Sequence, residues 1–75
     1  MIPDPVDVAD SYARGIADKA ECPTVAVASA MYADALATYG PDGLEWSIVN
    51  RAILKRWSKA TLERVKRFAW KEVQP

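Results

Sequence analysis

The residues of this chain that are best suited to chemistry are the charged and aromatic side chains that follow position 50. Residues 51–75 hold eight basic and two acidic side chains, a net charge of +6. Residues 1–50 hold eight acidic and two basic ones, a net charge of −6, so the whole chain is neutral. Because lysine and arginine neutralise phosphates, this asymmetry between the halves indicates a polyanionic partner for the basic end.

Ten residues are therefore candidates for binding nucleic acid or an acidic protein surface. They are Arg51, Lys55, Arg56, Lys59, Glu63, Arg64, Lys66, Arg67, Trp70 and Lys71. A secondary acidic surface is predicted near the N-terminus, at helical spacing, from Asp7, Asp10, Asp18 and Glu21. Arg14 lies four residues from both Asp10 and Asp18, so it is expected to form ion pairs with them. This acidic surface is either a solvated helix face or a docking face for a basic partner, including the basic half of this protein.

The composition argues against catalysis. The chain has no histidine, the commonest general base and metal ligand. Its single cysteine, Cys22, has no histidine to activate it and no second cysteine with which to hold zinc, and is expected to be a buried structural residue. The three glycines, at positions 15, 40 and 43, do not form a phosphate-binding motif. We expect no enzyme, no cofactor and no metal.

The elements that position these residues are helices. Apolar periodicity and terminal signals predict a single all-α domain over residues 1–75, a small bundle with helices at about 5–21, 24–39, 43–57 and 59–73. Asp4, Asp42 and Ser58 are predicted N-caps, and Gly40-Pro41 is a strong signal for the end of the second helix. That second helix is apolar nearly all round, which is typical of a central helix or of a dimer seam.

Helical spacing also separates core from surface. The predicted core face of the fourth helix consists of Leu62, Val65, Phe68, Ala69 and Val73. Trp46 and Trp57 are predicted core anchors. Trp70 lies off the apolar face of the fourth helix, so a place in the core and a place in an interface are equally expected for it. Asn50 falls on an inner stripe, so we expect it to be a buried hydrogen-bonding residue that ties a turn.

The last two helices, joined at Trp57-Ser58, have apolar inner faces and basic outer faces. Over about a third of the chain they resemble a helix-turn-helix. The resemblance implies that the fourth helix enters a major groove, with base edges faced by Lys59, Ala60, Glu63, Arg64 and Arg67. Phosphates would then be reached by Arg51, Lys55, Arg56 and Lys71.

The expected function is that of a small non-catalytic binding protein, such as a regulator, whose basic C-terminal hairpin contacts nucleic acid. The alternative is a protein–protein interaction module or an inhibitor, of the phage or mobile-element type, that docks on a larger nucleic-acid-handling complex. A homodimer is a further alternative. The lone cysteine and an acidic, proline-bearing start without the pattern of a secretory leader favour a cytoplasmic location. The most apolar stretch, 24–39, has 16 residues, fewer than the roughly 20 of a membrane span, so no membrane partner is expected.

Overall fold

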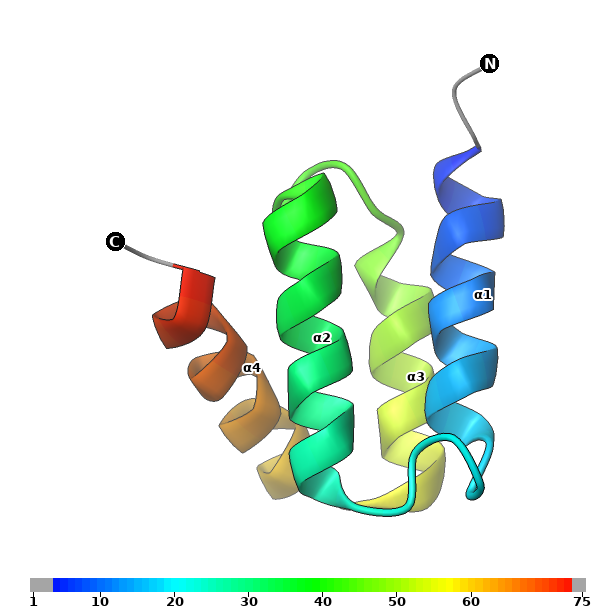
Figure 1. The fold of residues 1–75 in the computed structure, drawn as a ribbon, viewed down its shortest axis with the longest axis vertical. Helices are drawn as coiled ribbons and strands as arrows, with labels where there is room; N and C mark the ends of the chain where they lie inside the picture. The colour runs from blue at the N-terminus through cyan, green and yellow to red at the C-terminus, as the bar shows by residue number, and fades with distance from the viewer. Residues whose placement is uncertain (1–3, 74–75) are drawn as a thin grey trace.

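The computed structural model describes residues 4–73. These residues form four helices and no strand (Figure 1). The helices are α1 Pro5–Ala17, α2 Val25–Tyr39, α3 Trp46–Arg56 and α4 Lys59–Val73. The predicted all-α bundle of four helices is confirmed. Residues 1–3 and 74–75 lie outside the described residues, and with them part of the start on which the expectation of no leader rests.

The helices pack in two principal pairs, α1 with α3 and α2 with α4. Figure 1 shows α4 at one edge of the molecule and α1 at the other, with α2 between them. Buried side chains from all four helices form one core cluster, which includes Ile16, Leu36, Ile53, Leu62 and Val65. α2 therefore holds a central position, although the side that carries Asp34, Ala37 and Thr38 is exposed.

Local signals set most of the helix ends. The Asp4 carboxylate accepts a hydrogen bond from the amide two residues on, at 2.9 Å, and Pro5 occupies the first helical position. The Thr24 and Ser58 hydroxyls each accept from the amide three residues on, at 3.3 and 3.2 Å. α2 ends at Tyr39 and is capped by Gly40, whose φ of 73° and ψ of 172° lie in a region that essentially only glycine adopts without strain.

The end of α1 differs from the prediction. The helix ends at Ala17, four residues early, and Asp18 has extended backbone angles. The Asp18 carboxylate accepts a hydrogen bond from the Ala20 amide at 2.8 Å, and this local turn competes with continuation of the helix. Asp18 and Glu21 thus leave the helical stripe, and the expected Arg14–Asp18 ion pair is replaced by a single pair, Arg14–Asp10 at 2.8 Å.

The start of α3 also differs. The helix begins at Trp46 rather than near residue 43, and its N-cap, Glu45, makes no side-chain capping bond. Leu44 is buried in the core, and its carbonyl accepts from the Trp46 amide at 2.9 Å. Gly43 packs against the end of α2, where any Cβ would lie 2.0 Å from the Tyr39 carbonyl oxygen. Burial of Leu44 and this close approach hold the segment as a turn, so the predicted Asp42 cap is wrong.

Other inner residues are largely as predicted. Cys22 is fully buried, its thiol contacts the Thr24 carbonyl oxygen at 3.7 Å, and burial raises its pKa. Trp46 and Trp57 are partly buried and pack against the core cluster. Asn50 ties two helices together rather than a turn, because its Oδ1 accepts from the Tyr32 hydroxyl of α2 at 2.7 Å.

No helix within residues 4–73 has the length and apolar character needed to cross a membrane.

Candidate nucleic-acid interface

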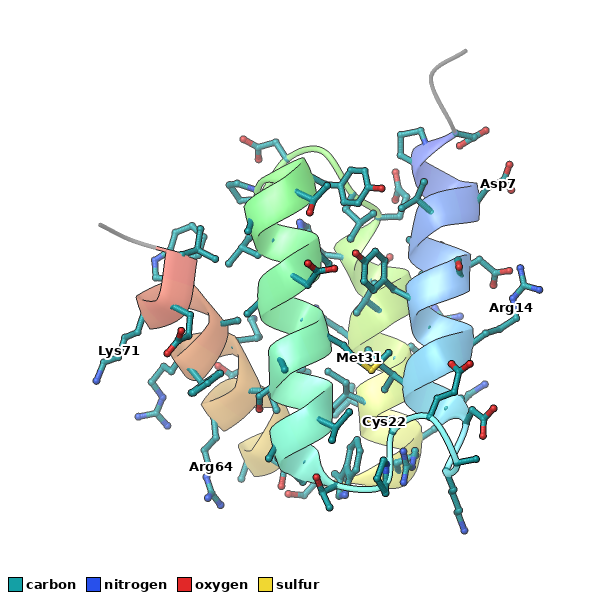
Figure 2. All side chains as sticks on the ribbon, in the orientation of Figure 1. Asp7, Arg14, Cys22, Met31, Arg64 and Lys71 are labelled. Carbon is teal, nitrogen blue, oxygen red and sulfur yellow. The ribbon has the colours of Figure 1, made fainter. Side chains whose placement is uncertain are left out.

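The helix that carries most of the candidate residues is attached to the bundle along one narrow strip. α4 buries Leu62, Val65 and Ala69 and contacts chiefly α2. Figure 2 shows Arg64 and Lys71 directed away from the bundle at this edge of the molecule. All five of the basic residues of the helix are exposed: Lys59, Arg64, Lys66, Arg67 and Lys71. With Glu63 and Glu72 included, α4 has a net charge of +3.

The core face of α4 is narrower than its sequence predicts. Phe68 and Val73 were expected in the core, yet Phe68 is 46% exposed and Val73 lies at the surface. The reason is that α4 sits at the edge of the bundle and packs chiefly against α2, so that within residues 4–73 the side of the helix that carries Phe68 stays exposed (Figure 1). Trp70 is also 46% exposed, so two large aromatic side chains lie among the basic residues.

A groove with a volume of about 460 Å³ lies between α2, α3 and α4. It is lined by Tyr32, Leu36, Pro41, Trp46, Asn50, Glu63, Lys66, Arg67 and Trp70. The Tyr32 and Trp46 rings are stacked, with their centroids 4.9 Å apart and an interplanar angle of 29°. The Trp46 indole N–H is buried and has no hydrogen-bond acceptor among residues 4–73. One polar group of this aromatic pair is therefore unsatisfied.

The groove combines aromatic surface with charge. Lys66 lies 3.9 Å from Glu63, the one ion pair of α4 among the described residues. Arg67 lines the same groove and has no ion-pair partner in residues 4–73. Burial, with the Glu63 charge as a second cause, raises the pKa of Tyr32 to about 12, so its hydroxyl keeps its proton and donates to Asn50 at neutral pH.

Two of the candidate residues of α3 lie in a different place. Arg51 and Lys55 line a second groove, of about 370 Å³, between α3 and α1, together with Asp10 and Arg14. The groove beside α4 takes its α3 residues, Trp46 and Asn50, from another face of the helix. The basic residues of α3 and α4 are thus divided between two surfaces rather than joined in one helix-turn-helix face.

Arg56 has a structural environment. Its Nη1 donates to the carbonyl oxygens of Ile16, at 2.7 Å, and Cys22, and its guanidinium lies 4.3 Å from the centre of the Trp57 ring. These contacts tie the end of α3 to the connection between α1 and α2. We therefore leave Arg56 out of the candidate interface, in place of the phosphate contact that the sequence suggested.

Of the secondary acidic surface, Asp7 and Asp10 lie on α1, at the opposite edge of the molecule from α4, whereas Asp18 and Glu21 lie in the connection that follows α1. Figure 2 shows Asp7 and Arg14 directed outward from α1. The described residues form two ion pairs, one within α1 and one within α4. Neither pair connects the acidic edge to the basic one. The two charged surfaces do not neutralise each other by direct contact within residues 4–73.

Sequence reasoning missed the aromatic part of the groove. Trp46 is predicted to be a core anchor, and Tyr32 belongs to the helix that is apolar nearly all round, but both also line the groove, with Asn50 beside them. The available signal was the presence of two hydrogen-bonding aromatic residues on inner faces.

Within the described residues, no three side chains of the metal-ligating kinds are grouped so that they could hold a metal ion.

Comparisons with known proteins give no relative: no family model, no curated protein and no solved structure matches the chain.

Proposed function

We propose that this protein is a small non-catalytic binding protein, such as a regulator, that contacts nucleic acid in the cytoplasm through the exposed face of α4. The observation that carries the proposal is the attachment of α4 by a single apolar strip, which leaves five basic side chains in solvent. Basic side chains grouped on one helix bind phosphates, and exposed aromatic rings among them offer stacking surfaces for bases.

Binding to fluorescent DNA and RNA oligonucleotides at several salt concentrations tests the proposal. Because counterions are released when phosphates are neutralised, affinity should fall roughly tenfold or more between about 50 and 200 mM salt if several phosphates are contacted. Absence of binding at low salt to every DNA and RNA probe would refute the proposal.

A double charge reversal locates the contact. Arg64→Glu with Arg67→Glu should abolish binding without unfolding the protein, because both side chains are exposed. Arg51→Glu with Lys55→Glu is the matched control, since it changes the total charge equally in the groove beside α1. An equal loss in the two double variants would contradict the assignment to α4 and indicate a general effect of net charge.

A protein-docking function is the second candidate, and the exposure of Phe68 and Trp70 beside Arg67 favours it. Aromatic residues and arginine are enriched at protein interfaces. In this case the partner is an acidic protein surface, such as part of a larger nucleic-acid-handling complex that the protein inhibits. Self-assembly through the acidic α1 of one copy and the basic α4 of another is the remaining alternative, and sizing over a range of salt and protein concentrations tests it.

A further inference from the structure

The groove between α2, α3 and α4 has the properties of a site for a flat, polar ring. Its volume of about 460 Å³ falls within the range of small-molecule sites. The stacked Tyr32–Trp46 pair lines it from α2 and α3, and the half-exposed Trp70 lines it from α4. Aromatic side chains from three helices thus line one groove, and they suit a planar aromatic guest because base–aromatic stacking is favourable for every nucleobase.

The polar groups of the groove suit the edge of such a ring. The Oδ1 of Asn50 is already occupied by the Tyr32 hydroxyl, so the Asn50 amide NH₂ is the group that this side chain offers as a donor. The Glu63 carboxylate lines the same groove as an acceptor. Nucleobase edges carry both donors and acceptors, so the Asn50 NH₂ can pair with an acceptor of the base and the Glu63 carboxylate with a donor.

The charge around the groove matches a phosphate backbone. Lys66 and Arg67 line the groove, and Arg67 is also three residues from Arg64 and four from Lys71 on the same helix. Residues at these spacings are neighbours on a helix surface, so a basic track runs from the groove to the outer face of α4. A ring seated in the groove and attached to a phosphate chain would have this track beside it.

We propose that the groove holds one unpaired nucleobase of a single-stranded nucleic acid while the basic residues of α4 bind the adjoining phosphates. This inference rests on the proposed nucleic-acid function and specifies its substrate class. A base within a duplex is stacked and paired, so it reaches such a groove only after extrusion from the helix. The protein therefore prefers single strands to duplexes of the same length.

The test compares Trp70→Ala with Phe68→Ala, using oligo(dT), oligo(U) and a DNA duplex of equal length as probes. Both residues are aromatic, lie on α4 and are 46% exposed, but only Trp70 lines the groove. Loss of stacking on one base should weaken single-strand binding by roughly 5–150-fold in Trp70→Ala. Phe68→Ala should change it less than about twofold, and Trp70→Phe should retain most of the affinity because a stacking face remains. Thermal melts of each variant establish that it is folded, and the oligo(dT) and oligo(U) arms distinguish DNA from RNA.

The outcomes separate this inference from the function on which it rests. If no oligonucleotide binds at low salt, the proposed function is wrong. If single strands and duplex bind equally well, or if Trp70→Ala and Phe68→Ala weaken binding equally, the function stands and the base-binding groove is wrong. An acidic poly(Glu, Tyr) peptide serves as the protein-like probe. Should its binding depend on Trp70 while oligonucleotide binding does not, the groove is a peptide site and the inference is overturned.

Discussion

Substitution of Arg56 by alanine should destabilise the protein far more than any change at its exposed basic residues. Arg56 is half-buried at the end of α3, and its Nη1 donates to the carbonyl oxygens of Ile16 and Cys22. Ile16 and Cys22 are both fully buried residues, on either side of the turn that follows α1. Without the guanidinium, two carbonyl groups in this region lose their only side-chain donor among the described residues.

The size of the effect follows from these two hydrogen bonds. A hydrogen bond from a charged donor contributes about 1.5–3 kcal/mol. Since both bonds come from one nitrogen of a half-buried side chain, we take the lower end of that range for each, a total of about 3 kcal/mol. A 75-residue domain has a stability of only about 4–11 kcal/mol. The same loss should lower the Tm by roughly 12–24 °C.

Circular dichroism melts and urea unfolding of Arg56→Ala, with Lys55→Ala as control, measure this effect. Lys55 carries the same charge, lies in the same last turn of α3 and is exposed, so its loss removes the interaction with the helix dipole but no side-chain hydrogen bond within residues 4–73. Lys55→Ala should therefore change stability by about 0.5 kcal/mol or less. A Tm decrease for Arg56→Ala of less than about 4 °C, near 1 kcal/mol, would refute the structural role that we assign to Arg56.

Three further outcomes are expected. Gly40→Ala should lower the free energy of unfolding by about 1–3 kcal/mol in urea, because its backbone angles suit only glycine, and unchanged stability would contradict this strain argument. Stability should fall as pH rises between about 10 and 12, since burial raises the pKa of Tyr32 and of Tyr12 from 10.0 to about 12 and the unfolded chain releases these protons first. Below pH 10, Tyr12 and Tyr32 should add no slope to the dependence of stability on pH, and Tyr32→Phe should make the alkaline decline shallower; an identical pH profile would rule out that contribution. Neutralising the acidic edge with Asp7→Asn and Glu21→Gln should raise oligonucleotide affinity at about 0.01 M salt, where the Debye length is about 30 Å, but not at about 0.15 M, where it is about 8 Å. An equal gain at both salt concentrations would show that the two edges interact by direct contact.

Where a helix begins or ends by a local hydrogen bond, the sequence predicts it well. The caps at Asp4 and Ser58 and the stop at Gly40 depend on residues within three positions, so their patterns are visible in the chain. The end of α1 at Ala17 and the start of α3 at Trp46 were misplaced. There, a carboxylate–amide turn and the burial of Leu44 outweigh helix signals that were read without tertiary structure.

The parts of the candidate site that depend on helical spacing could be predicted from the sequence, whereas those that depend on tertiary contacts could not. Exposure of Arg64 and Arg67 follows from helical spacing alone. The structural role of Arg56 could not be predicted, because its acceptors lie 40 and 34 residues away in sequence. The groove was likewise hidden, because only the tertiary fold brings Tyr32 of α2 and Trp46 of α3 into a stack and places Trp70 of α4 in the same groove.

The zero net charge of the chain is not an obstacle to binding a polyanion, because the two charged surfaces lie apart. The described part of the molecule measures 34 × 29 × 19 Å, and α1 and α4 occupy opposite edges with α2 between them (Figure 1). At physiological salt a Debye length is about 8 Å, so a phosphate in contact with α4 responds to the basic residues beside it and little to the acids of α1. At longer range the charges of the two edges offset each other, so the net charge of zero does not attract a polyanion and only the weaker, shorter-ranged dipole field remains. At physiological salt, attraction is therefore limited to the immediate surroundings of α4, and affinity must come from the fit of α4 and its groove rather than from overall charge.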